Sequence, residues 1–313
     1  MSRAYTGRDM VARCVNHPFF AVDDWFIGTT PMSAGIPEAV RELTATFRYN
    51  DIESVEQLFE QYPDRLACLI LEPEKYDPPA DGFLQKLRDL CDRNGTVLIF
   101  DEMITGFRWH LGGAQAFYEV VPDLSTWGKA MANGFSVSAL AGKKEIMELG
   151  GLLHDKERVF LLSGTHAAET HGLAAAMATM KVYRDEPVIE TMWKQGQRLT
   201  AGLERAIADQ DLEAHIGLFG RPCCLVYGTK DAEGNPSQPF RTLFIQETMK
   251  RGLIAPSVII SYSHDDEAVD RTVEAFHDAF KVYRKALTEG IDGYLESRPV
   301  QPVWRTHNNY RLG

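Results

Sequence analysis

Residues 97–134 read VLIFDEMITGFRWHLGGAQAFYEVVPDLSTWGKAMANG. Four apolar residues, 97–100, stop abruptly at Asp101 and Glu102, and a short apolar run of this kind is typical of a strand buried on both faces. The acidic pair then lies at the carboxyl end of the strand, where open α/β sheets place their ligands. Further along, Lys129 follows Gly128 in a turn and has little to pair with nearby in the sequence. These residues are the first candidates for a functional site.

The preceding part of the chain repeats this strand pattern. Residues 66–71 form a second buried run, which ends at Glu72. Residues 81–93 place their apolar side chains on one side of a helix, and the Asn-Gly pair at 94–95 supplies its stop. A strand, a helix and a strand in this order predict the βαβ unit of a parallel sheet, and therefore an α/β fold.

Three parts are expected along the chain. Residues 184–187, Arg-Asp-Glu-Pro, break an alanine-rich helix and mark the end of a large domain, residues 1–186. Helical and strand patterns then alternate in a small α+β domain, residues 187–290. The last residues, 291–313, have no regular period and predict a loosely held tail.

Composition excludes several classes of protein. A net charge of −11 argues against non-specific nucleic-acid binding, which needs a basic face. The five cysteines are an odd number without C-x-x-C spacing, so we expect neither a disulfide framework nor a zinc site. This cysteine usage predicts that the protein resides in a reducing cytoplasm. The sequence contains no run of 18 apolar residues, so we expect no membrane-spanning helix. Because G-x-G-x-x-G and Walker loops are absent from the sequence, dehydrogenase and nucleotide-hydrolase functions are not favoured.

Three motifs in residues 97–134 carry a family resemblance. Asp-Glu-x-x-Thr-Gly-Phe-Arg at 101–108, Gly-Gly-Ala-Gln at 112–115 and Pro-Asp-Leu-Ser-Thr-x-Gly-Lys at 122–129 follow in order. Together they resemble the class III pyridoxal-phosphate aminotransferases, in particular the glutamate-1-semialdehyde aminomutase branch. The resemblance implies a fold type I enzyme with a doubly wound, mostly parallel sheet, a small C-terminal domain and pyridoxal 5'-phosphate as its cofactor.

The cofactor's chemistry explains the two central residues. Pyridoxal phosphate acts as an electron sink when its ring nitrogen is protonated, and a buried carboxylate raises the pKa of that nitrogen. Asp101 is our candidate for this carboxylate. Lys129 is our candidate for the amine that forms the internal Schiff base and then carries a proton between the substrate Cα and the cofactor, provided that its pKa is lowered. Taken alone, each residue would be better explained without a function, Asp101 as a capping aspartate and Lys129 as a solvated surface lysine; the spaced pair inside the motif favours the functional interpretation.

The resemblance implies further residues around the cofactor. Phe19 matches the aromatic residue that stacks on the ring, and Met103 would pack on the opposite face. Glu72 would lie beside the site, and Thr165 would reach the phosphate held by a neighbouring subunit, which implies a homodimer with shared active sites. The alternatives are an ordinary core phenylalanine, a polar residue that closes a strand, and a threonine helix cap. Ile104 is apolar, as the corresponding residue is in the aminomutase branch. Aminotransferases of ω-amino acids carry a glutamine at this position.

Three functions remain open at this stage. The resemblance favours amino-group transfer of the glutamate-1-semialdehyde 2,1-aminomutase type on a small amine or keto substrate. The segment up to residue 37 is shorter than the mobile gate of that branch, so a two-substrate transaminase of a keto sugar or other biosynthetic keto intermediate is the alternative. Residues 2–8 resemble the helix that follows the family's phosphate-binding loop, so the resemblance also implies a preceding segment. Without such a loop, an inactive homologue that serves as a structural partner is the third possibility.

Overall fold

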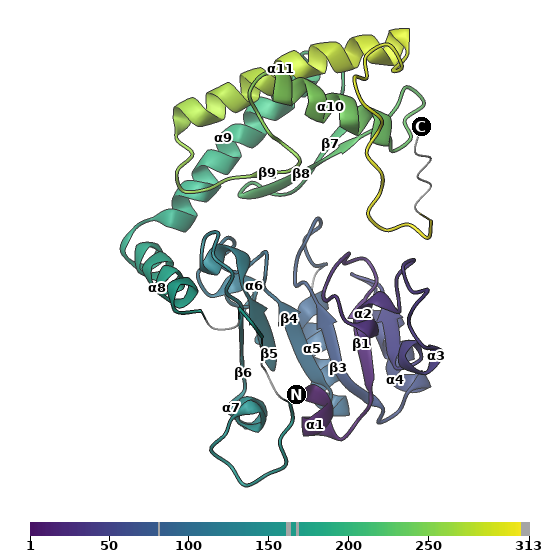
Figure 1. The fold of residues 1–313 in the computed structure, drawn as a ribbon, viewed down its shortest axis with the longest axis vertical. Helices are drawn as coiled ribbons and strands as arrows, with labels where there is room; N and C mark the ends of the chain where they lie inside the picture. The colour runs from purple at the N-terminus through teal and green to yellow at the C-terminus, as the bar shows by residue number, and fades with distance from the viewer. Residues whose placement is uncertain (81, 161–163, 167–168, 308–313) are drawn as a thin grey trace. The chain divides into compact units, whose positions relative to one another are not determined.

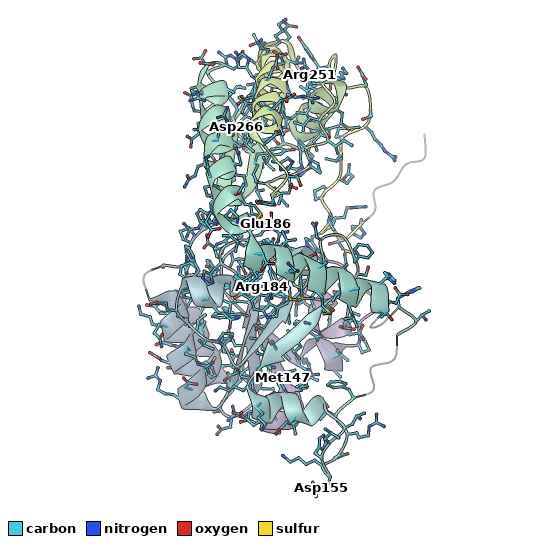
Figure 2. The ribbon with its side chains drawn as sticks, turned by 90° about the vertical axis from the view of Figure 1, so that its left-hand side faces the viewer. Met147, Asp155, Arg184, Glu186, Arg251 and Asp266 are labelled. Atoms are coloured by element: carbon cyan, nitrogen blue, oxygen red, sulfur yellow. The ribbon has the colours of Figure 1, made fainter. Side chains whose placement is uncertain are left out.

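The computed structural model describes residues 1–80, 82–160, 164–166 and 169–307, and the chain divides into two compact units (Figure 1). The first unit contains Met1–Glu186 and the segment that begins at Trp304. The second unit is Pro187–Val303, so residues 291–303 belong to it. In Figure 2, the labelled residues Arg184 and Glu186 mark the end of the Met1–Glu186 stretch of the first unit.

A six-stranded sheet forms the centre of the first unit, in the order β2-β1-β3-β4-β5-β6. The first five strands are parallel and only β6 is antiparallel, which confirms the predicted mostly parallel α/β sheet. The chain passes from β1 outward to β2 and then returns to β3 on the other side of β1, so the winding reverses there. The strands are β1 (Met10–Cys14), β2 (Thr44–Phe47), β3 (Leu66–Leu71), β4 (Val97–Asp101), β5 (Leu124–Trp127) and β6 (Ala139–Gly142).

The central strands are buried on both faces, as their apolar runs predict. In β3, Leu69 and Leu71 pack with α4 (Ile52–Gln61) and α5 (Phe83–Asn94) in one core cluster. Cys68 and Ile70 point the other way and join a second cluster, which includes Ile146 of α7 (Lys144–Met147). Alternate residues of a strand face opposite sides of a sheet, so one apolar run supplies both clusters.

The remaining elements of the first unit are short, except for α8. Gly95 ends α5 in the left-handed region at φ 61°, as the Asn-Gly pair predicts, whereas Asp81 lies outside the described residues. The other elements are α1 (Ser2–Thr6), α2 (Asp24–Ile27), α3 (Glu38–Arg41), α6 (Gly113–Phe117), η1 (Lys129–Met131), η2 (Glu148–Gly150) and α8 (Thr170–Asp185).

The second unit is the predicted α+β arrangement. Its antiparallel sheet has the order β7-β8-β9, and three long helices accompany it around aromatic residues that include Phe244, Phe276 and Phe280. Strand β9 has only two residues in ladder pairing. The elements are α9 (Val188–Ala208), β7 (Ile216–Arg221), β8 (Cys224–Thr229), α10 (Gln238–Lys250), β9 (Val258–Ile259) and α11 (Asp266–Glu289).

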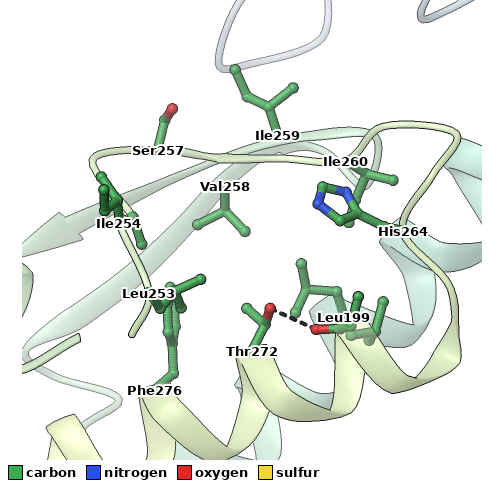
Figure 3. A pocket seen from close by; sticks show the side chains of 13 residues that line it. Leu199, Leu253, Ile254, Ser257, Val258, Ile259, Ile260, His264, Thr272 and Phe276 are labelled. Atoms are coloured by element: carbon green, nitrogen blue, oxygen red, sulfur yellow. Dashed lines mark hydrogen bonds between the residues drawn. The ribbon is translucent and has the colours of Figure 1, made fainter. Parts of the chain in front are cut away.

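A cavity of about 120 Å³ lies within this second unit (Figure 3). Apolar side chains line most of it, among them Leu199, Val258 and Phe276. His264 adds a ring nitrogen at one end, but its Nδ1 already accepts the N–H of Ser261 at 2.9 Å. In the parts of the chain that the structure describes, no helix is both long and apolar enough to cross a membrane.

The core of β3 generates a test of the fold. Replacing Leu69, which is fully buried, with alanine leaves a cavity between β3 and its helices, and we expect the free energy of unfolding to fall by about 2–5 kcal/mol. The matched control is Leu152→Ala, whose side chain is 80% exposed and whose loss should change stability by less than about 0.5 kcal/mol. Urea unfolding followed by circular dichroism measures both, and equal effects would contradict the assigned core.

Candidate active site

The carboxyl ends of three neighbouring strands lie at one edge of the first unit's sheet. Leu71 pairs with Phe100, so Glu72 comes level with Asp101, and Asp101 itself pairs with Thr126 of β5. Adjacent strands are roughly 4.8 Å apart, which leaves little separation between side chains at equal height on the same face. Three residues beyond Thr126, the chain reaches Lys129. The parallel register thus gathers the residues that the sequence placed after separate strands.

Asp101 is a buried carboxylate with only 8% of its surface exposed. Its Oδ1 accepts the backbone N–H of Met103 at 3.0 Å. Burial raises the pKa of Asp101, while this hydrogen bond and the nearby charge of Lys129 lower it in part. Because burial disfavours the ionised form of this carboxylate, a cationic group placed beside it would stabilise that form.

Lys129 begins the short helix η1 in a left-handed conformation at φ 47°. The side chain reaches solvent, yet partial desolvation lowers its pKa, and the cations Lys75 and Arg108 lower it further. Glu72 and Asp101 act in the opposite direction and favour the ammonium form. The structure therefore brings the predicted pair, Asp101 and Lys129, into one electrostatic cluster, and it adds charged neighbours to them.

Met103 packs against the turn that leads to Lys129. A Cβ built on Gly128 would lie 2.6 Å from the Cε and 2.9 Å from the Sδ of Met103, so a larger residue at position 128 would require this thioether to move. Arg108 returns to its own segment, where its guanidinium donates to the carbonyl of Ile104 at 2.8 Å. The loop after β4 thus holds a thioether and a cation next to the lysine turn.

The other two predicted residues lie on separate segments. Phe19 follows β1, is 52% exposed and meets the ring of Phe26 edge-on at 5.8 Å. Thr165 is exposed and precedes α8, and the neighbouring residues 161–163 and 167–168 lie outside the described part of the chain. Roles for Phe19 and Thr165 at the cofactor stay predictions.

Glu72 has a partner that sequence analysis missed. Lys75 Nζ lies 2.6 Å from Glu72 Oε1, and the two side chains are only 12% and 5% exposed. On the other side, the backbone N–H of Glu72 donates to Nδ1 of buried His17 at 3.0 Å. Burial, with the charges of Lys75 and Arg13, lowers the pKa of His17 to about 3, so this ring is neutral and its proton lies on Nε2. The spacing Glu-x-x-Lys after a buried strand was the available signal.

Glu102 is the buried residue that shapes the loop after β4. Its carboxylate accepts the N–H groups of Ala114 and Gln115 at 2.8 Å each, and the hydroxyl of Thr105 donates to it as well. Burial raises the pKa of Glu102, and these hydrogen bonds oppose that effect. The carboxylate thereby ties α6 to the end of β4. Sequence analysis identified the Asp-Glu pair but assigned Glu102 no role.

A second buried acid, Glu74, fixes the same region. It accepts the indole N–H of Trp109 at 2.9 Å and the hydroxyl of Tyr118. The loop after β3 and the segment after β4 are therefore joined by one carboxylate. His166 and His171 each approach Glu169 instead, and no cluster suited to a metal ion occurs among the residues described.

Sequence comparison identifies relatives across most of this chain. The model of the family described as Aminotransferase class-III matches residues 1–280. The glutamate-1-semialdehyde 2,1-aminomutases of Francisella tularensis subsp. holarctica strains FTNF002-00 / FTA and OSU18 are each 33% identical to this chain over 297 residues. Each match covers 87% of this chain and 68% of the relative.

Solved structures share the fold of this chain. The internal aldimine form of FumI from Sphingopyxis sp. MTA144, which holds PLP, has a TM-score of 0.81 and 25% identity, covering 94% of this chain and 69% of that one. An omega-transaminase from Sphaerobacter thermophilus has a TM-score of 0.77 and 26% identity, covering 90% and 70%. These similarities confirm the predicted architecture of a transaminase.

The contact between Glu102 and Gly113 can be tested directly. A Cβ on Gly113 would lie 2.6 Å from the carboxylate carbon of Glu102, and the residue has φ +74°. Gly7 is a matched control, because it has φ +67° but open space around its Cβ position. We expect Gly7→Ala to cost about 1–2 kcal/mol of backbone strain. Gly113→Ala should cost about 1–3 kcal/mol more, because it also disturbs a buried carboxylate.

Denaturant unfolding of the two variants measures this difference. Equal losses of stability would show that the carboxylate of Glu102 can move away from a new Cβ without lowering the free energy of unfolding. That result would contradict the role described for Glu102.

Proposed function

Because the chain belongs to the class III aminotransferase family, we propose that it is a pyridoxal-phosphate-dependent enzyme that transfers amino groups. The family resemblance carried by the three motifs is confirmed. One observation carries the proposal: buried Asp101 and the pKa-lowered Lys129 occupy a single charged cluster at the ends of adjacent parallel strands. This arrangement supports Asp101 as the acid and Lys129 as the amine in the proposal.

The residues present suit the cofactor's ring and its carbonyl carbon. When bound, pyridoxal phosphate withdraws electrons from the substrate Cα. Asp101 would keep the ring nitrogen protonated, since burial disfavours its ionised form and a cation beside it would offset that cost. Lys129 would carry the cofactor and move a proton at the substrate Cα. Phe19 and Met103 would enclose the ring, and Glu72 would lie beside the amine.

We propose a reaction of the glutamate-1-semialdehyde 2,1-aminomutase type as the first candidate. The relatives with this name match the chain at 33% identity, and Ile104 is apolar as in that branch. A two-substrate transamination, with a keto sugar or related intermediate as the acceptor, is the second candidate, and the solved neighbour named an omega-transaminase supports its transamination step. The aminomutase needs no separate amine donor, so release of a keto acid from an added donor amino acid would favour the second candidate.

A homodimer belongs to this proposal. Thr165 is exposed on its own protomer, which suits a residue that would contact the phosphate of the neighbouring subunit's cofactor.

The role of Lys129 has a direct test. After incubation with pyridoxal phosphate, the protein should show the absorbance of a cofactor joined to a lysine amine, and borohydride reduction should leave a pyridoxyl group on the peptide that contains Lys129. Lys129→Ala should lose both signals. Lys144→Ala is the control, because the Lys144 side chain is 85% exposed. A colourless, unmodified wild-type protein would favour the inactive structural homologue.

The role of Asp101 makes a separate prediction. Asp101→Asn keeps the shape but removes the charge that holds the ring nitrogen protonated, so we expect the turnover rate to fall roughly a hundredfold or more. Labelling at Lys129 should persist, which separates this variant from Lys129→Ala. Asp64→Asn is the control, since the Asp64 side chain is 91% exposed. Unchanged turnover in Asp101→Asn would remove Asp101 from the mechanism.

A further inference from the structure

The buried ion pair between Glu72 and Lys75 lies inside the charged cluster around Lys129. Its Nζ–Oε1 separation is 2.6 Å, and both side chains are largely removed from solvent. Lys75 also has its ammonium 5.6 Å from the centre of the Tyr76 ring. Burying two charges is unfavourable unless they neutralise each other, so the placement of this pair calls for a physical reason.

The charges that face Lys129 come from several segments. Glu72 and Lys75 follow β3, Asp101 ends β4, and Arg108 lies in the loop after β4. His17, which follows β1 and contacts Glu72, is neutral and adds no charge.

Without Lys75, Lys129 would face two buried carboxylates. Both Glu72 and Asp101 stabilise its ammonium form, and an ammonium has no lone pair with which to attack a carbonyl carbon. Asp101 has a task of its own in the proposed function, because it would pair with the ring nitrogen. Glu72 would then remain as the carboxylate that holds the proton on Lys129.

We propose that Lys75 is a positioning residue that neutralises Glu72 and so keeps the amine of Lys129 available for reaction at neutral pH. The inference rests on the proposed function for its purpose, but the electrostatic effect belongs to the cofactor-free protein. The inference predicts that the charges of Lys75 and Glu72 have opposite effects on the pKa of Lys129. Removal of the Lys75 charge raises the pKa of Lys129, and removal of the Glu72 charge lowers it.

The test measures Lys129 in the cofactor-free protein. Brief labelling with acetic anhydride at a series of pH values, followed by peptide mass spectrometry, gives the pH at which half of the Lys129 amine is unprotonated. In Lys75→Met we expect this midpoint to rise, with labelling below the midpoint slowed roughly threefold to tenfold, as a change of a half to one pKa unit requires. Lys75→Arg keeps the charge and should restore the wild-type midpoint.

Two further variants complete the cycle. Glu72→Gln should move the midpoint to lower pH, and the double variant Glu72→Gln/Lys75→Met should return it toward the wild-type value. Local structural damage would not produce shifts of opposite sign that cancel. Lys144→Met is the control for loss of a lysine from an ion pair, because Lys144 lies 3.5 Å from Glu148 in an exposed pair.

The outcomes separate this inference from the proposed function. A midpoint that stays unchanged or falls in Lys75→Met overturns the inference. If Lys75→Met does not fold, a midpoint that fails to fall in Glu72→Gln overturns it instead. Opposite shifts in a protein that never takes up pyridoxal phosphate would support the electrostatic effect and refute the proposed function.

Discussion

The parallel register of β3, β4 and β5 is the constraint on which the site depends. Parallel strands direct all of their carboxyl ends to one edge, and here the pairing brings Glu72, Asp101 and Thr126 to the same height. A one-residue slip in any strand would turn these side chains to the opposite face. Such a slip is opposed by the core, because it would also exchange the side chains that fill the two apolar clusters.

Four buried carboxylates stand around this edge, and each is satisfied in a different way. Glu102 receives backbone N–H groups from α6, Glu74 receives side-chain donors, and Glu72 has an ammonium partner. Asp101 receives a backbone N–H on one oxygen. An ionised carboxylate in a low-dielectric environment needs such partners, so the first three acids stiffen the loops while Asp101 is suited to accept a cationic ligand.

Much of the fold followed from local pattern. Apolar runs of four to six residues located β3 and β4, and the Asn-Gly pair located the end of α5. β2 was missed because Thr44–Phe47 is a short strand with mixed polarity, and β7 because glycines interrupt it. The candidate pair Asp101 and Lys129 came from motif and spacing. Sequence analysis drew nothing from the Glu-x-x-Lys spacing that connects Glu72 and Lys75, and it did not predict that Glu102 accepts the N–H groups of Ala114 and Gln115.

The chain's local order and motifs were sufficient to assign an α/β fold and a protein family and to nominate a candidate acid–amine pair, because these inferences use residues close to each other or recurring motifs. The charge balance around Lys129 was decided only by tertiary structure. Glu72 follows β3, Asp101 ends β4 and Lys129 follows β5, so their interaction depends on distances in space that sequence separation does not define. Burial, which makes those charges strong, exists only once the sheet and its helices have packed.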